Sequence, residues 1–298
     1  MAQTLRVVLA GAGGPIGRAL AGLLPRATVS SLTSQSCDLT SIPDTEVALA
    51  GADVVVFLAR SGRPLARLVQ ASRQDLDVLL ADTMARAAPK TSVKRIVLFA
   101  CGDNDDREAV LAQSGVPVAV LRGGGTEPAA ELARLVEAAG VEQRTLAAWT
   151  GGDDVRPALA VGSNVCSVQR HALPGGWTAK DAAWKYFEWL HGAVPLVRVE
   201  RRDGVFQVAA AGLEALLLQH APGRSTPESC VLEFRGGAFA GQKGRFEFRV
   251  LAGGGLLTAL IGFEPALPWP VYRLTQAVAH GAVMKRFGAF LAAQPARA

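Results

Sequence analysis

The 298-residue chain is long for one compact domain and comfortable for two. Half of its residues are hydrophobic and 19% are charged, which excludes a disordered chain, and the longest apolar runs, such as 116–121 and 256–263, are far shorter than the roughly 18–20 residues of a transmembrane helix. The net charge is +5, but the basic residues are spread out and no nucleic-acid-binding motif is present, so we expect no nucleic-acid partner.

The first residues also lack the pattern of a secretory signal peptide, because a short apolar run after Arg6 leads directly into a glycine-rich turn. The four cysteines have no CxxC spacing and the four histidines no metal-ligand pairing. We therefore expect a cytoplasmic protein with free thiols and no metal site. The oligomeric state is left open.

The first half of the chain alternates strand-like and helix-like segments. A β-rich run at 5–10 breaks into glycines and is followed by a helical stretch at 18–24. Further strands are expected at 29–32, 53–59, 95–100 and 118–122, and helices at 64–87, 107–113 and 129–139. This alternation predicts an α/β Rossmann domain with a parallel, doubly wound sheet, and the almost wholly apolar run 53–59 suits a strand buried on both faces.

The second half of the chain has a different order of predicted helices and strands. A stretch rich in Gly, Asp, Pro and Ser at 150–164 suggests a connection between a first domain of residues 1–160 and a second of residues 164–298. Beyond it we expect a helix at 179–190, a terminal helix at about 269–293, and strands at 165–173, 196–202, 205–219, 230–239, 243–252 and 255–263. Glycine-containing turns between these strands indicate antiparallel hairpins, so the second domain is predicted to be α+β, an antiparallel sheet with a long C-terminal helix. In that helix Leu274, Val278, Val283, Phe287 and Leu291 would form one buried stripe.

The glycine-rich turn has the spacing typical of a dinucleotide-binding loop. Between the first strand and the first helix stand Gly11, Gly13, Gly14, Pro15, Ile16 and Gly17. The first glycine allows the tight exit from the strand, the middle ones allow backbone amides to approach a diphosphate, and the last allows close packing of helix on strand. The uncapped helix N-terminus then favours the negative charge of the phosphates.

Several landmarks make the resemblance to a family specific. The segment 11–20, Cys-Asp-Leu-Thr at 37–40, ADVVVFLA at 52–59, VKRIV at 93–97, and SGVP at 114–117 followed by Leu-Arg at 121–122 resemble the extended and atypical short-chain dehydrogenase/reductases. The epimerase/dehydratase and NmrA-like groups belong there, and the short passage before 37–40 is similar to dTDP-4-dehydrorhamnose reductases. The resemblance covers roughly residues 4–127. It implies that Asp38 and Leu39 lie beside an adenine, and Ala59 and Arg60 beside the ribose or nicotinamide.

The end of the second strand bears on cofactor preference. An acid there would hold the 2′-hydroxyl of NAD, whereas this chain has Leu32, Thr33, Ser34 and Gln35. Two hydroxyls and an amide can donate to a 2′-phosphate, and no acid repels it. We therefore predict binding of NADP, with NAD as the alternative.

The usual proton-transfer machinery of this family, a Ser/Thr with Tyr-x-x-x-Lys, is missing from the first half. The two tyrosines, Tyr186 and Tyr272, both lie in the second half. Catalytic residues therefore stay unassigned, with Cys101, Asp103 and Tyr272 as candidates. Each has a structural alternative: a buried inert thiol, a cap for the helix that starts near residue 107, and a packing tyrosine.

The second half resembles the START-like polyketide cyclase/dehydrase superfamily, which has a helix-grip fold. The clearest part is 246–293, with GGGLLT at 253–258 and FEP at 263–265. The resemblance implies a curved sheet around a long helix with an apolar cavity for a lipid, polyketide, sterol or other bulky hydrophobic molecule. Two roles are open for the residues of that helix that the resemblance singles out, contact with such a ligand or an ordinary packing or surface position: Trp269, Tyr272, Arg273 and His280.

Three functions remain open from the sequence. The first is an NAD(P)-dependent oxidoreductase that acts on a bulky hydrophobic substrate held by the second domain. The second is a cyclase, dehydratase or isomerase in which the nucleotide is structural. The third is a non-catalytic NADPH-binding sensor or carrier. The intact glycine loop favours the first and third, and the missing Tyr and Lys favour the second and third.

Overall fold

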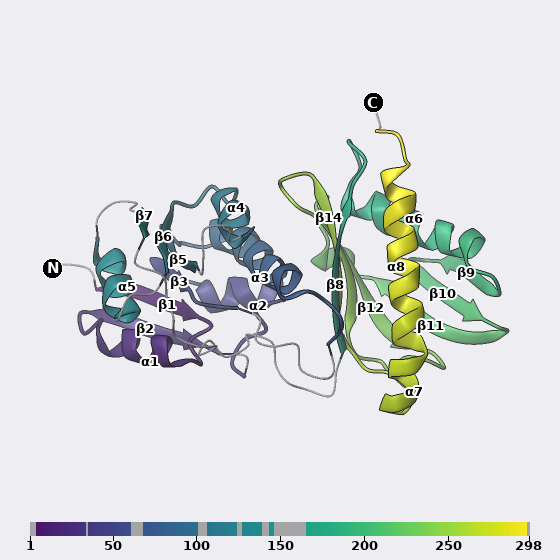
Figure 1. Ribbon diagram of the computed structural model, residues 1–298, viewed down its shortest axis with the longest axis horizontal. Coiled ribbons are helices and arrows are strands. Elements are labelled where there is room, and N and C mark those ends of the chain that lie inside the picture. The colour runs from purple at the N-terminus through teal and green to yellow at the C-terminus, as the bar shows by residue number, and fades with distance from the viewer. Residues whose placement is uncertain are drawn as a thin grey trace. The chain divides into compact units, whose positions relative to one another are not determined.

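A computed structural model describes residues 4–33, 35–60, 68–100, 106–123, 127–138, 143–145 and 165–296. The chain divides into two compact units (Figure 1). Residues 1–63 and 76–160 make up the first unit, and residues 64–75 and 161–298 the second. Each unit has its own sheet and its own hydrophobic core, and each is described by itself.

The first unit is built on a parallel sheet, as the alternation of strands and helices predicted. Its strand order in the described residues is β2-β1-β3-β5-β6-β7, and every pairing is parallel. The strands are β1 (Leu5–Ala10), β2 (Ala27–Leu32), β3 (Val54–Phe57), β5 (Arg95–Ala100), β6 (Val118–Arg122) and β7 (Gln143–Thr145). All four residues of β3 are buried, as expected for a strand covered on both faces.

Helices cover both faces of this sheet, which makes it doubly wound (Figure 1). They are α1 (Pro15–Gly22), α2 (Ile42–Leu49), α3 (Arg73–Ala87), α4 (Asp106–Ala112) and α5 (Pro128–Glu137), with a 3₁₀ turn at Ala88–Lys90. Leu20 of α1 and Leu132 of α5 pack into the core on one face. Leu49, Leu80 and Leu111 from α2, α3 and α4 pack into the core on the other.

Two elements of the first half differ from expectation. Helix α2 was not predicted, because its eight residues are too few to show a clear periodicity; its signal is local, since Ser41 caps the helix by accepting a hydrogen bond from the amide of Asp44. The helix predicted over 64–87 is wrong at its start. Ser72 accepts a hydrogen bond from the amide of Asp75 (3.0 Å), a capping contact that starts α3 at Arg73, and residues 68–70 form a strand.

The second unit is a mainly antiparallel sheet with helices on one face. Its order is β4-β8-β14-β13-β12-β11-β10-β9, so the first long strand of the unit, β8, lies beside the last, β14. The strands are β4 (Leu68–Gln70), β8 (Val165–Ala172), β9 (Val197–Arg202), β10 (Val205–Ala210), β11 (Leu213–His220), β12 (Ser229–Gly236), β13 (Arg245–Val250) and β14 (Gly255–Phe263). Only the β4–β8 pairing is parallel among those described.

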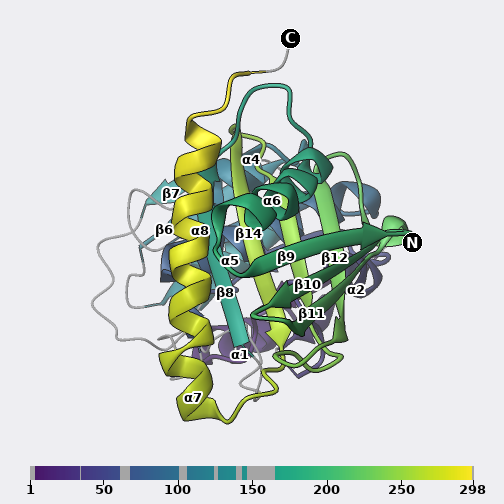
Figure 2. The same cartoon turned by 90° about the vertical axis from the view of Figure 1, so that its right-hand side faces the viewer.

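Three helices and a 3₁₀ turn complete this unit: α6 (Ala179–Ala193), α7 (Trp269–Leu274), α8 (Gln276–Ala292) and the turn at Pro222–Arg224. Figure 2 shows α6 and α8 on the same face of the sheet, where an aromatic core joins them to it. The predicted antiparallel sheet with a long C-terminal helix is therefore confirmed. Within the described ranges, no helix has both the length and the apolar character needed to cross a bilayer.

The strand predicted over 205–219 is instead a hairpin of β10 and β11. Ala211 and Gly212 form the turn, with φ angles of +51° and +85°. Two successive positive φ values are the signature of a tight hairpin turn, for which Asn-Gly is the usual sequence. Gly212 suits the second position, but alanine rarely adopts the first, so Ala-Gly is a weaker turn signal than Asn-Gly.

The terminal helix is also interrupted. It breaks at Thr275, whose hydroxyl donates to the carbonyl of Val271 (2.6 Å), and α7 and α8 follow on either side. The predicted buried stripe is wrong in its first part, since Leu274 is 74% and Val278 61% exposed. The break changes the rotational phase of the helix, so that the buried residues of α8 are Ala277, Met284, Phe287 and Leu291.

Strand β13 carries an unusual row of buried charges. Glu247 is 3% and Arg249 0% exposed, and the two are joined by a hydrogen bond of 2.7 Å from Arg249 Nε to Glu247 Oε2. Arg245 Nε donates to Glu247 Oε1 (2.5 Å). Burial by itself would raise the pKa of Glu247, but the charges of Arg249 and Arg245 outweigh it and lower the pKa.

Candidate functional site

The glycine loop leaves the carboxyl end of β1 at the point where the strand order reverses. From β1 the chain proceeds to β2 on one side, and β3 lies on the other side. In open parallel sheets, ligands bind in the crevice at such a point. The amides of Gly11 and Ala12 both donate to the carbonyl of Leu32 (3.0 Å each), which ties the loop to the end of β2.

Two of the predicted glycines occupy positions that admit no side chain. Gly11 has φ +88°, and a Cβ built on it would lie 2.5 Å from the Cα of Ala59. A Cβ on Gly17 would lie 2.6 Å from the Cα of Ala12. The loop is thus folded tightly between the ends of β1 and β3, and the first turn of α1 lies directly on it.

The start of α1 is open to an anion. Gly14 is the N-cap residue and gives no side-chain cap, Pro15 stands in the first turn, and that turn contains no acid. The first amides of a helix have no intrahelical partner and carry the positive end of the helix dipole. Arg18 Nη1 donates to the carbonyl of Gly13 (3.1 Å), which adds a cation beside the loop. This arrangement suits a phosphate or diphosphate group.

A compact turn follows β2 beside the loop. The amide of Thr33 donates to Ser36 Oγ (2.9 Å), and the amide of Cys37 donates to the carbonyl of Thr33 (3.0 Å). Thr33 therefore heads the turn at the sheet edge where cofactor preference was expected to be decided. Ser34, the other residue assigned there, lies outside the described residues.

Asp38 and Leu39, expected beside an adenine, follow this turn. The side chain of Asp38 is exposed, and its Oδ1 accepts hydrogen bonds from the amide (3.0 Å) and the hydroxyl (2.5 Å) of Thr40. Leu39 is buried in the core beneath α2. Asp38 and Leu39 therefore precede α2 in different environments: the Asp38 carboxylate lies on the surface, and the Leu39 side chain packs into the core.

Ala59 and Arg60, expected at the ribose or nicotinamide side, follow β3. Ala59 is fully buried against Gly11. Arg60 is partly exposed, and its Nε lies 3.7 Å from Asp77 Oδ2. The structure thus brings Gly11, Thr33 and Ala59 together at the carboxyl ends of three neighbouring strands.

Arg107 also lies at this edge and was not predicted from the sequence. Its side chain is fully buried, with Nη1 donating to the carbonyl of Ala59 and Nη2 to the carbonyl of Phe99, both at 2.9 Å. Its guanidinium also lies 5.9 Å from the centre of the Phe57 ring. One side chain from α4 therefore holds the ends of β3 and β5 together. An arginine in the first turn of a helix gives no sequence signal of such burial.

The three catalytic candidates are not brought together. Cys101 and Asp103 lie outside the described residues. Tyr272 belongs to α7 of the second unit, where it is 3% exposed and stacks on Trp269 at 5.5 Å. Burial raises the pKa of Tyr272 to about 12, so its phenol is protonated at neutral pH.

Helix α8 presents two unpartnered polar atoms to the interior of the second unit. In the described part of the chain, His280 Nε2 and Gln276 Oε1 are buried without a hydrogen-bond partner, one turn apart. The His280 ring stands edge-on to Phe246 at 6.4 Å, and burial lowers its pKa to about 4, which keeps it neutral. Buried polar atoms usually have a hydrogen-bond partner, so His280 Nε2 and Gln276 Oε1 suit contact with one polar group.

Comparisons with known proteins give distant similarities. No family model matches the chain. The auxiliary protein GraX of Staphylococcus aureus is 24% identical over 254 residues, which cover 83% of this chain and 75% of GraX.

Three solved structures are similar to part of the chain. A GDP-6-OMe-4-keto-L-xylo-heptose reductase from C. jejuni is 15% identical over 41% of this chain and 47% of its own (TM-score 0.33). A dTDP-4-dehydrorhamnose reductase from Bacillus anthracis, with NADP bound, is 16% identical over 41% and 54% (TM-score 0.33). The enzyme WbmH of Bordetella bronchiseptica, with NAD⁺ bound, is 15% identical over 51% and 78% (TM-score 0.38). The chain matches about half the length of these two reductases.

Proposed function

We propose that the first unit binds a nicotinamide dinucleotide at the glycine loop, with NADP preferred and NAD as the alternative. On this proposal the chain is an NAD(P)-dependent oxidoreductase of the short-chain dehydrogenase superfamily, and its second domain holds a bulky hydrophobic substrate. The observation that carries the proposal is the cradle at the end of β1. There Gly11 and Gly17 leave no room for a side chain, and α1 begins without a side-chain cap.

The residues around the cradle have complementary roles in this proposal. The amides at the start of α1 and the cation of Arg18 receive the diphosphate. Thr33 receives the 2′-phosphate and Asp38 borders the adenine. Ala59 and Arg60 border the nicotinamide half, with Arg107 acting as the positioning residue that holds Ala59. A bound nicotinamide dinucleotide supplies hydride transfer.

Two features of the second unit support a hydrophobic ligand there. The strand order places β8 beside β14, and the long helix α8 lies over the sheet, an arrangement in keeping with the START-like resemblance. The unpartnered atoms of His280 and Gln276 face the interior of this unit, which is otherwise aromatic and aliphatic. A mostly apolar molecule with one hydrogen-bonding group would satisfy them.

A second candidate function is a non-catalytic NADPH-responsive protein. It is favoured by the absence of any tyrosine from residues 1–160, which removes the usual Tyr-x-x-x-Lys proton donor. The similar protein GraX is named an auxiliary protein, which agrees with this alternative.

Calorimetric titration of the full chain with NADPH and NADH tests the binding proposal. The informative variants are Pro15→Glu and its neutral counterpart Pro15→Gln, because Pro15 is exposed in the first turn of α1. An acid at this position favours the helix but repels a diphosphate. We expect NADPH to bind wild type and Pro15→Gln similarly, and Pro15→Glu about tenfold more weakly. Failure of both nucleotides to bind wild type refutes the proposal.

Oxidation of NADPH in the presence of bulky ketones, enones and quinones then separates the two candidates. Turnover with any of these acceptors supports the oxidoreductase. Tight NADPH binding without turnover across the panel supports the non-catalytic protein.

A further inference from the structure

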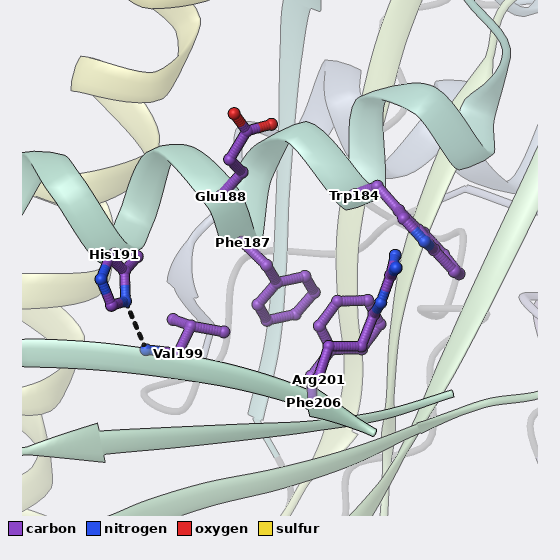
Figure 3. Close-up of a pocket in the computed structure, with 7 residues that line it drawn as sticks. All are labelled: Trp184, Phe187, Glu188, His191, Val199, Arg201 and Phe206. Atoms are coloured by element: carbon purple, nitrogen blue, oxygen red, sulfur yellow. Dashed lines mark hydrogen bonds between the residues drawn. The ribbon is translucent and has the colours of Figure 1, made fainter. Parts of the chain in front are cut away.

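The second unit contains a hollow that the dinucleotide proposal does not use. It measures about 400 Å³ and lies between α6 and the hairpin of β9 and β10 (Figure 3). Small-molecule sites have volumes of roughly 300–1,000 Å³, so the hollow is large enough for a compact ligand. We refer to it as the α6 pocket.

The floor of the α6 pocket is made of aromatic rings that already hold one another in place. Phe187 and Phe206 are stacked at 4.2 Å and are 3% and 2% exposed. Trp184 stands edge-on to Phe206 at 5.1 Å. The two phenylalanines are almost wholly buried and hold this wall in place, so the aromatic platform open to a flat ring is mainly that of the partly buried Trp184.

The rim of the pocket carries a cation where the strand pattern would place an apolar residue. Side chains alternate along β9, and Val197, Val199 and Arg201 share the side that faces α6. The Arg201 guanidinium carbon lies 5.7 Å from the centre of the Trp184 ring, and Lys180 Nζ lies 5.1 Å from it. Two positive charges therefore stand beside the aromatic platform.

These charges have no counter-ion among the described residues: neither Arg201 nor Lys180 forms an ion pair there. Glu188, the acid at this pocket, pairs with Lys185 at 3.0 Å, and Figure 3 shows its carboxylate directed away from the two phenylalanines.

A neutral donor adds to the rim. His191 Nδ1 accepts a hydrogen bond from the amide of Val199 (3.0 Å), so in the neutral ring the proton is on Nε2, which is then a donor.

We propose that the α6 pocket binds a small, flat aromatic anion, with its ring on the platform and its carboxylate or equivalent group paired with Arg201. Apolar contact with the rings supplies the affinity, and the two uncompensated cations supply the preference for negative charge. The pocket lies wholly within the second unit and does not depend on dinucleotide binding. A different explanation of Arg201 is protection of the terminal strand β9 against edge-to-edge pairing, for which an inward charge is a known device.

The experiment uses the full chain and two probes of the same size, 2-naphthoate and the uncharged 2-naphthamide. Binding is measured by calorimetry and by quenching of tryptophan fluorescence, at physiological salt. The test variant is Arg201→Gln. Its matched control is Arg202→Gln, because Arg202 is the next residue on β9, points to the other face and has a side chain that is 85% exposed.

We expect wild type and Arg202→Gln to prefer 2-naphthoate over 2-naphthamide by about tenfold, and Arg201→Gln to lose that preference. Lys180→Gln, at an exposed position on α6, should reduce the preference for 2-naphthoate in part. It is the test variant if Arg201→Gln does not fold. The proposal is overturned by equal binding of both probes to wild type, by an unchanged preference in Arg201→Gln, or by no binding of 2-naphthoate at millimolar concentration. If Arg201 serves only to protect the strand edge, its replacement will promote self-association without affecting either probe.

Discussion

Helix α1 contains two glycines whose replacement by alanine should have opposite effects. Gly22 ends the helix, is exposed, and has no atom within 4 Å of the position of an added Cβ. Alanine is favoured over glycine in a helix, so Gly22→Ala should stabilise the first unit by about 0.5 kcal/mol.

Gly17 has the same intrinsic preference for alanine, but its added Cβ would lie 2.6 Å from both the Cα and the carbonyl oxygen of Ala12. Ordinary contact begins at 3.4 Å, and the atoms in the way are backbone, which no rotamer change can move. Overpacking of this kind costs about 1–3 kcal/mol, and a backbone obstacle places Gly17→Ala toward the upper end. Because the glycine loop must move, NADPH affinity should fall as well, whereas Gly22→Ala should retain it.

Urea unfolding followed by far-UV circular dichroism measures the two variants. The chain has two units and need not unfold in a single step, so peptide-resolved hydrogen exchange over residues 5–24 assigns the change to the first unit. The expected gap between the variants is about 2–3 kcal/mol. Equal stability of Gly17→Ala and Gly22→Ala, or unchanged NADPH binding by Gly17→Ala, would show that the cradle is not as tight as described.

Three further predictions concern buried polar groups. Arg107→Leu removes the two hydrogen bonds that this side chain donates to the carbonyls of Ala59 and Phe99 and should destabilise the first unit by about 2–4 kcal/mol in the same urea assay; a loss below about 0.5 kcal/mol would contradict the bridging role. Glu247→Gln removes the negative charge that pairs with the buried guanidinium of Arg249 and should cost about 3–5 kcal/mol. Its control Glu200→Gln, from a pair that is 64% and 85% exposed, should change stability little, and similar losses in the two variants would refute the contrast. The pKa of His280 is lowered from 6.5 to about 4, so between these pH values the unfolded state binds a proton that the folded state does not bind. The unfolding free energy should therefore fall by about 3 kcal/mol as the pH drops from 6.5 to 4, and His280→Phe should remove that part of the slope; an identical pH profile in the variant would exclude this titration.

The sequence alone determined the features that depend on local chemistry. The glycine loop at 11–17 follows a strand and opens a helix, and both neighbours are visible as short periodic runs, so its place at the mouth of a parallel sheet was predictable. The burial of β3 on both faces followed from an uninterrupted apolar run. The antiparallel character of the second unit followed from glycine turns between its strands.

Tertiary contacts determine which polar residues are buried and which strands pair across long stretches of sequence. Arg107, Glu247 and the Nε2 atom of His280 are buried although these residues lie in helix or strand patterns that exposed residues share, and what buries them comes from distant parts of the chain. The strand at 68–70 joins a sheet formed by residues beyond 164, and the hairpin at 211–212 forms although alanine disfavours the positive φ of Ala211. Local patterns record the preference of a segment for helix or strand, whereas burial and pairing depend on free energy contributed by partners far away in sequence.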